Sequence, residues 1–173
     1  MAASKRRIVP GWQGRYYEDF QVGDVYRSAV GRTVTETDNL LFTGLTLNTN
    51  QVHFNQQYCE QTRWGRILVN SCFTLSLIVG MSVPDVSMNV MANLGWEEVT
   101  LPHPVFVGDT LYAETEVLHT RESRSHPNVG IVNVRTRGIN QNGRVVIDLT
   151  RSAMVYKRDA APGRDLFPEV AGA

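Results

Sequence analysis

The alternation of apolar and polar residues predicts strands throughout the second part of the chain, residues 88–158. Residues 110–119 and 130–138 alternate two sets of side chains along the chain, and residues 88–101 and 144–157 are also rich in apolar residues. A period of two with one polar face is typical of an antiparallel sheet. Between the last two strands, the sequence Asn140-Gln141-Asn142-Gly143 predicts a tight hairpin with a positive φ angle.

The first part of the chain, residues 16–83, mixes a strand with helices. We expect one short strand over 24–34, a helix over 38–45 opened by Thr35 and Asp38, and a long helix from Leu68 to about Val83. The long helix is apolar nearly all round, which predicts burial on most of its faces, and Pro84 ends it.

A long buried helix followed by an antiparallel sheet predicts an α+β fold in which a strongly curved sheet wraps around the helix. Such a sheet leaves an edge that has to be covered or paired. A dimer with a continuous sheet is one solution. The 173 residues suit one domain, and we place it at 16–158, between an N-terminal arm (1–15) and a C-terminal tail (159–173).

The amino-acid composition excludes several classes of function and indicates the cellular compartment. The 17 Lys and Arg balance the 17 Asp and Glu, so the net charge of zero argues against a nucleic-acid partner. No apolar run approaches the length of a membrane span, and no apolar stretch follows the basic first residues as in a signal peptide. Two cysteines, Cys59 and Cys72, are too few for a disulfide framework, and we expect partly buried reduced thiols. We therefore expect a cytoplasmic protein without membrane contact or bound metal.

Two segments could carry chemistry. The polar loop Asn48-Thr49-Asn50-Gln51-Val52-His53 places a histidine, which titrates near neutral pH, among amides, so His53 could act as a general acid or base. The long helix begins at Leu68-Val69-Asn70-Ser71, and free N–H groups at a helix start favour developing negative charge, such as a thioester oxyanion. The ordinary alternatives are a hydrogen-bonding histidine and a simple helix cap.

The order of several segments resembles the MaoC-like hydratases, the (R)-specific enoyl-CoA hydratase group with a hot-dog fold. Tyr17 to Asp24 is similar to the family's opening, Y-x-E-D-x-x-V-G-D, and Thr35 to Asp38 and Phe42 follow it. Pro104 to Leu111 is similar to the family's P-V-x-x-G-D-T-L. The resemblance covers roughly 16–157. It implies an α+β hot-dog fold and reversible hydration of a 2-enoyl-CoA thioester.

The resemblance also implies roles for individual residues. The family's Asp-x-Asn-Pro-x-His motif falls on Asn48, Asn50, Gln51 and His53, so the catalytic carboxylate is replaced by an amide. The family's oxyanion-hole pair falls on Asn70 and Ser71, where the Ser71 N–H can still donate. The residues before and after His53 resemble a branch that hydrates short branched dicarboxylic acyl-CoAs, such as itaconyl-CoA or mesaconyl-CoA.

Three functions stay open at this point: hydration, thioester hydrolysis with Glu60 near the helix, and acyl-thioester binding without catalysis. CoA is expected as part of the substrate, with no other cofactor, and its phosphates need cations. We expect Arg63 and Arg66 to bind them, and Arg121, Arg124 and His126 form a second basic cluster. Structural roles are expected for Asp38 (helix start), Asp109 (turn), and Trp64 and Trp96 (packing). We expect a homodimer or a larger homo-oligomer.

Overall fold

Six antiparallel strands form one sheet in the computed structural model, which describes residues 7–163 and 167–168. The outermost residues of the expected arm and tail lie outside this range. The strand order is β1-β4-β5-β6-β3, and β2 also pairs with β4. The strands are β1 (Val25–Arg27), β2 (Arg32–Thr33), β3 (Val90–Thr100), β4 (Thr110–Glu122), β5 (Val129–Asn140) and β6 (Val145–Tyr156).

Strands β4 and β5 confirm the period-two prediction. Along β4, buried Leu111, Ala113, Thr115 and Val117 alternate with more exposed residues. The expected hairpin joins β5 to β6: Gly143 has φ +74°, and Asn140 Oδ1 accepts hydrogen bonds from the N–H groups of Asn142 and Arg144, at 3.0 Å each. The turn is therefore fixed by its own asparagine.

The strand expected over 24–34 is wrong in its continuity, because β1 and β2 are separate. Both pair with β4. Between them the Ser28 hydroxyl, rather than a backbone carbonyl, accepts from the Ala113 N–H at 3.0 Å, and Gly31 lies against the ring of Tyr112. The Ser28 hydroxyl thus replaces a backbone carbonyl as the acceptor for β4, and the residues between β1 and β2 belong to neither strand.

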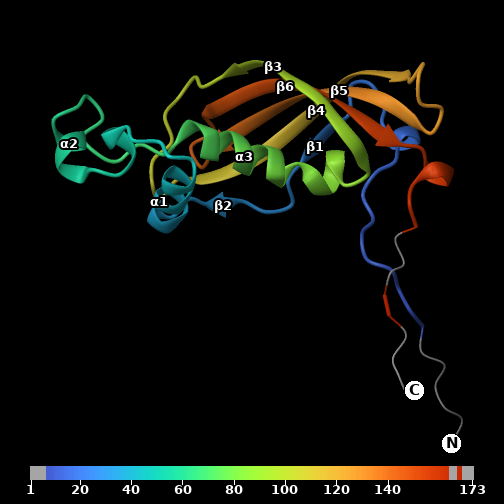
Figure 1. Cartoon of the computed structure of the whole chain (residues 1–173), viewed down its shortest axis with the longest axis horizontal. Helices are drawn as coiled ribbons and strands as arrows, with labels where there is room; N and C mark the ends of the chain where they lie inside the picture. The colour runs from blue at the N-terminus through green and yellow to red at the C-terminus, as the bar shows by residue number, and fades with distance from the viewer. Residues whose placement is uncertain (1–6, 164–166, 169–173) are drawn as a thin grey trace, which may run out of the picture.

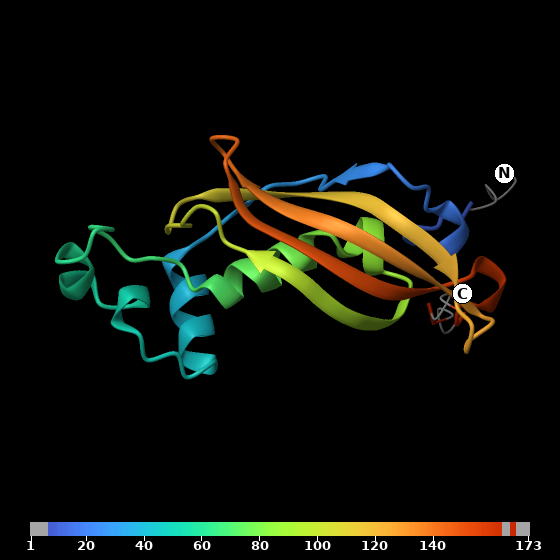
Figure 2. The same ribbon diagram turned by 90° about the horizontal axis from the view of Figure 1, so that it is seen from above.

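Helix α3 (Ser71–Met81) lies along one face of the curved sheet (Figures 1 and 2). It begins three residues later than expected, because the preceding residues pair like a strand: Val69 N–H donates to Val105 O at 2.9 Å, and Leu68 forms a β-bridge with Phe106. Asn70 then caps the helix, accepting from the Cys72 N–H at 3.0 Å. The π-helical turn η3 (Val83–Ser87), with Pro84, follows the helix.

The packing of α3 is close but one-sided. A Cβ at Gly138 of β5 would lie 2.7 Å from Ile78, so only glycine lets the helix approach the strand this closely. Ile78 is fully buried in a core with Val69, Leu111 and Ile147. The expected burial on most faces is wrong for this chain, because the sheet covers only one side. Five apolar side chains stay only partly buried: Phe73, Leu75, Leu77, Val79 and Met81.

A small helical lobe projects from one end of the sheet (Figures 1 and 2). It contains α1 (Glu36–Leu45), the 3-10 turn η2 (Gln51–His53) and α2 (Gln56–Glu60). Thr35 and Asp38 form the expected capping box, and α1 therefore begins two residues earlier than predicted. Further 3-10 turns are η1 (Tyr17–Asp19) and η4 (Arg158–Ala160). In the described part of the chain no helix is both long and apolar enough to span a bilayer.

Candidate active site

His53 is held in one orientation by its surroundings. It ends η2, which is capped by Asn50, and only 8% of its surface is exposed. Its Nδ1 lies 2.9 Å from the carbonyl oxygen of Leu68. Because a carbonyl can only accept, Nδ1 carries the hydrogen, and Nε2 of the neutral ring keeps its lone pair. The ring is therefore arranged as a base whose reactive atom is Nε2.

Asn39 of α1 joins the His53 turn to the start of α3. It is fully buried; its Nδ2 donates to His53 O at 2.7 Å, and its Oδ1 accepts from the Asn70 N–H at 2.9 Å. Asn70 in turn donates from Nδ2 to Thr43 Oγ1 at 3.3 Å. Our sequence analysis missed Asn39 and Thr43. Their spacing of four residues puts two polar side chains on one helix face, a signal that they share a buried partner.

Asn48 and Asn50 shape the loop that leads to His53. Asn48 Oδ1 accepts from the Asn50 N–H at 3.1 Å, and Asn50 Oδ1 accepts from the Val52 N–H at 3.3 Å. Asn50 thus caps η2, and both side-chain carbonyls are used within the loop. The Nδ2 groups of both residues have no acceptor within the described part of the chain.

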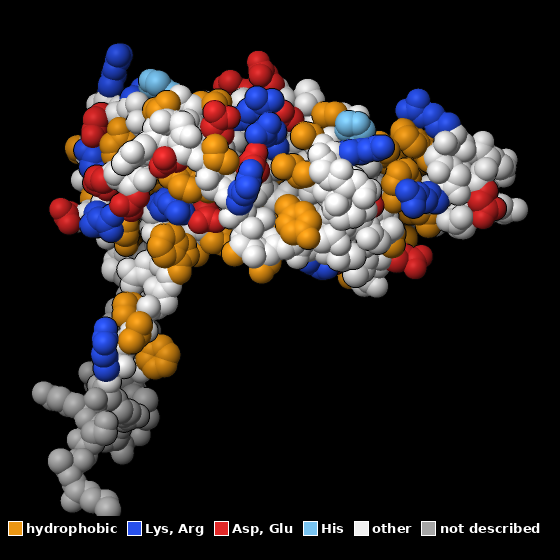
Figure 3. Space-filling model, turned by 180° about the vertical axis from the view of Figure 1, so that it is seen from behind, with side chains coloured by type: hydrophobic (Ala, Val, Ile, Leu, Met, Phe, Trp, Pro, Cys, Tyr) orange, Lys and Arg blue, Asp and Glu red, His pale blue; other side chains and the backbone are white. Residues whose placement is uncertain are grey.

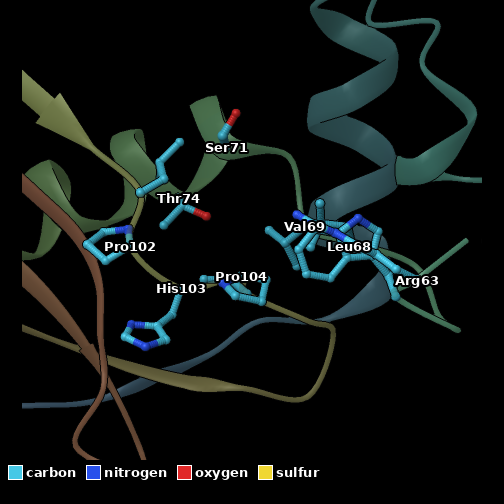
Figure 4. Close-up of a pocket in the computed structure, with 11 residues that line it drawn as sticks. Arg63, Leu68, Val69, Ser71, Thr74, Pro102, His103 and Pro104 are labelled. Carbon is cyan, nitrogen blue, oxygen red and sulfur yellow. The ribbon is translucent and has the colours of Figure 1, made fainter.

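A cavity of about 270 Å³ opens at the start of α3. Figure 4 shows Ser71 and Thr74 on one side, residues 102–104 opposite, and Leu68, Val69 and Arg63 at one end. The Ser71 N–H, in the first turn of α3, donates to no atom of the described residues. An unused N–H at a helix start, beside a cavity, is suited to an anionic oxygen.

The structure brings the expected site residues together in two groups. Ser71 and Arg63 line the cavity, together with Leu68. His53 does not line it, but contacts Leu68 through the carbonyl oxygen of that residue. The ring and the Ser71 N–H are thus separated by the short segment 68–70, and Asn39 ties the Asn70 end of that segment to the His53 backbone.

The arginines of the described chain fall into paired and unpaired sets. Six of them form ion pairs with carboxylates: Arg15, Arg27, Arg32, Arg135, Arg137 and Arg158. Figure 3 shows the resulting mixture of acidic and basic side chains on one face. Arg63 and Arg66 have no acidic partner within 7–163. Instead their guanidinium groups lie over the rings of Trp64 and Phe106, at 4.2 and 3.8 Å.

Other expected residues have structural surroundings. Glu60 is exposed on α2 and accepts from Gln56 at 3.0 Å, as in a solvated helix face. Asp109 accepts from the Phe106 N–H at 2.9 Å and so closes the expected turn. Trp64 packs edge-on against Phe106 and also lines the cavity. Trp96 is half exposed on β3. Cys72 is exposed, so the expectation of a partly buried thiol is wrong for this residue.

Comparison with known proteins identifies the family. Residues 19–138 match the MaoC-like domain family. The chain belongs to this family. The match confirms the resemblance seen in the segments 17–24 and 104–111, and it includes the His53 loop and the start of α3.

Relatives of this MaoC-like domain include enzymes about twice its length. It is 38% identical to the mesaconyl-CoA hydratase of Cereibacter sphaeroides over 92% of the chain and 47% of that protein. It is 32% identical to the β-methylmalyl-CoA dehydratase of Chloroflexus aurantiacus, over 84% of the chain and 41% of that protein. The chain thus spans about half the length of these relatives.

Solved structures confirm the hot-dog fold. A MaoC domain dehydratase of Chloroflexus aurantiacus superposes with a TM-score of 0.83 at 30% identity, over 94% of this chain and 47% of that one. A Mycobacterium tuberculosis protein described as having a double hot-dog fold gives a TM-score of 0.78 at 26% identity, over 93% and 51%. The predicted α+β class, with a curved antiparallel sheet against a central helix, is therefore correct.

Proposed function

We propose that this MaoC-like domain adds water reversibly across the double bond of a short, branched or dicarboxylic 2-enoyl-CoA thioester. The observation that carries the proposal is that a fixed imidazole, His53, contacts residue 68 and an unused N–H lies at residue 71, so both flank one short segment at the start of α3. The relatives named mesaconyl-CoA hydratase and β-methylmalyl-CoA dehydratase support this class of reaction.

In the proposed mechanism, the N–H of Ser71 stabilises negative charge, and His53, which contacts residue 68, transfers the proton. The Ser71 N–H donates to the thioester carbonyl oxygen and stabilises the enolate that forms, an interaction that is worth about 3–4 kcal/mol. His53 Nε2 removes a proton from water, whose oxygen bonds to C3 of the acyl chain. The imidazolium then returns that proton to C2. Proton transfer of this kind contributes about 10²–10⁴-fold.

Asn48 stands where the family motif has a carboxylate, and an amide cannot accept a proton at neutral pH. Because Asn48 Oδ1 is used by the loop, its Nδ2 group is the part that could orient the attacking water. We therefore propose His53 as the single general acid–base and Asn48 as a water-positioning residue. Replacement by Asp would test this division: a faster Asn48→Asp variant would show that the position can take part in proton transfer.

A dicarboxylic acyl group is supported by Arg63. This guanidinium lies at the end of the cavity that also contains Ser71, and within 7–163 no carboxylate pairs with it. Its stacking on Trp64 holds it while leaving its N–H groups free for a substrate carboxylate. We propose that Arg63 distinguishes dicarboxylic from monocarboxylic acyl groups, instead of binding CoA phosphates.

We also propose that this domain associates with a second copy of the same fold. Strand β3 is a sheet edge, and Met91, Leu94, Trp96 and Val99 expose apolar side chains along it. Relatives of twice the length, and a relative with a double hot-dog fold, support a partner domain of the same kind. We propose a homodimer, which light scattering would test. The free thiols of Cys59 and Cys72 support the expected cytoplasmic location.

The test is an assay of purified protein with mesaconyl-CoA and with crotonyl-CoA as the monocarboxylic comparison. Hydration removes the conjugated double bond, whereas a thioesterase releases free CoA thiol, so absorbance and thiol titration distinguish the two reactions. A binding module would bind the thioesters in calorimetry and turn over neither. We expect loss of conjugation without thiol release, and Arg63→Ala should weaken mesaconyl-CoA turnover much more than crotonyl-CoA turnover.

A further inference from the structure

A second hollow adjoins the active-site cavity and collects cationic side chains. The two hollows share His103 and Pro104. The second one is lined by Arg66, which precedes α3, and by Arg144 of the β5–β6 hairpin, with Asp109 beside them. Neither arginine pairs with a carboxylate in the described part of the chain. Two exposed guanidinium groups in one hollow, without acidic partners, favour an anionic ligand.

Hydrogen bonds connect the segments that surround this hollow. Gln141 of the hairpin donates from Nε2 to Asp109 Oδ1 at 2.8 Å and accepts from the Thr110 N–H at 2.9 Å. His103 Nδ1 lies 2.8 Å from Val145 O, at the start of β6. As at His53, a carbonyl partner means that Nδ1 carries the hydrogen. The other ring nitrogen can therefore donate to an anionic oxygen only when the ring is an imidazolium.

The single carboxylate of the hollow is already occupied. Asp109 accepts from the Phe106 N–H through Oδ2 and from Gln141 through Oδ1. Arg66 is positioned by the Phe106 ring 3.8 Å below its guanidinium carbon. The guanidinium donors of Arg66 and Arg144 are therefore free for a ligand, and the group of Arg66 is held in place before any ligand arrives.

We infer that Arg66, His103 and Arg144 form a subsite for the phosphate groups of the CoA nucleotide, next to the cavity that takes the acyl thioester. The inference rests on the proposed function for the identity of the ligand. CoA carries its phosphates at one end and the thioester at the other. The two hollows lie side by side, because both are lined by residues 103 and 104. Arg144 and His103 are new to this role, and Arg66 keeps the role expected from the sequence.

Calorimetric titration with CoA, dephospho-CoA and pantetheine tests the subsite without requiring turnover. Arg66→Ala and Arg144→Ala should each weaken CoA binding about 10- to 100-fold, as expected for a lost charge-assisted contact, and leave pantetheine binding unchanged. Arg124→Ala is the matched control: Arg124 is exposed and unpaired in the β4–β5 loop, at the opposite end of β5 from Arg144. It should change CoA affinity less than about 2-fold.

The outcomes separate this inference from the proposed function. Equal CoA affinity for Arg144→Ala and Arg124→Ala would overturn the subsite, even if the wild type hydrates enoyl-CoA. Weaker CoA binding confined to the Arg66 and Arg144 variants would support it, even if no hydration is found. Hydration of a pantetheine thioester should survive in both variants, because neither residue lies in the cavity that contains Ser71.

Discussion

Buried polar side chains are hydrogen-bonded at the start of α3, whereas the buried arginine at its end is largely without partners. At the start of the helix, Asn39 bonds the His53 carbonyl and the Asn70 N–H at 2.7 and 2.9 Å, and Asn70 donates to Thr43 at 3.3 Å. At its end, Arg151 of β6 is only 1% exposed, and a single nitrogen of its guanidinium is satisfied, by donation to Ser82 Oγ at 2.8 Å. Its Nε and second terminal nitrogen have no partner among the described residues.

The start of α3 belongs to the candidate active site, whereas the buried guanidinium at its end lowers the stability of the fold. Around His53, the buried side chains of Asn39 and Asn70 are hydrogen-bonded. Among the described residues, His53 Nε2, the Ser71 N–H and the Nδ2 groups of Asn48 and Asn50 are left without a partner. At Arg151, burial lowers the pKa to about 10, so the guanidinium is still charged at neutral pH, and no carboxylate of the described residues pairs with it. The negative end of the α3 dipole offsets part of the cost. The buried side chains at the start of α3 are therefore partnered, whereas two of the three guanidinium nitrogens at its end have no partner among the described residues.

The largest effect should follow from His53→Ala. Loss of the only proposed general base should lower kcat for mesaconyl-CoA hydration by about 10²–10⁴-fold. The stability of the variant should fall by the cost of a small cavity and of the hydrogen bond lost at Leu68 O. His126→Ala, an exposed histidine in the β4–β5 loop, is the control and should keep full activity. If His53→Ala kept most of its activity, the proposed mechanism would be wrong.

Asn39→Ala should have the next largest effect. It leaves two buried groups, His53 O and the Asn70 N–H, without partners, at a cost of about 2–4 kcal/mol in the free energy of unfolding. Urea denaturation measures this cost. Because Asn39 positions His53 without touching substrate, kcat should fall while KM changes little. The exposed Gln57→Ala on α2 should change the free energy of unfolding by less than about 0.5 kcal/mol; similar effects for the two variants would contradict the bridge.

These two residues also show what the sequence could and could not predict. The four long strands and the hairpin at Gly143 follow from local patterns, because alternation and turn chemistry are set by neighbouring residues. The polar loop also points to His53, whose catalytic role stays a prediction. Asn39 could not be placed, because its partners lie 14 and 31 residues away. The late start of α3 has the same cause, since Val69 pairs with Val105 across the fold.

Arg151→Met tests the other end of α3. Replacing an unpaired buried charge by an apolar chain of similar length should leave the protein as stable as before, or stabilise it by about 1–2 kcal/mol at pH 7. The control is Arg135→Met on β5, which breaks an exposed ion pair with Asp148 and should destabilise by at most about 1 kcal/mol. A loss of more than about 2 kcal/mol in Arg151→Met would mean that the charge has a partner after all.

The smallest effect should come from Asp38, the residue before Asn39 but on the solvent side of α1. Hydrogen bonds from the Thr35 side chain and backbone, and the Arg32 charge, lower the pKa of Asp38. Its stabilisation is therefore complete above the ordinary aspartate pKa and is lost as the pH falls through the lowered value. Asp38→Asn should cost about 0.5–1 kcal/mol at pH 7. In urea denaturation the gap to wild type should close on acidification, and a gap that stayed constant would contradict the assignment. Hydration should be unchanged, because Asp38 contacts neither His53 nor Asn70, whereas its neighbour Asn39, on the buried side of α1, contacts both.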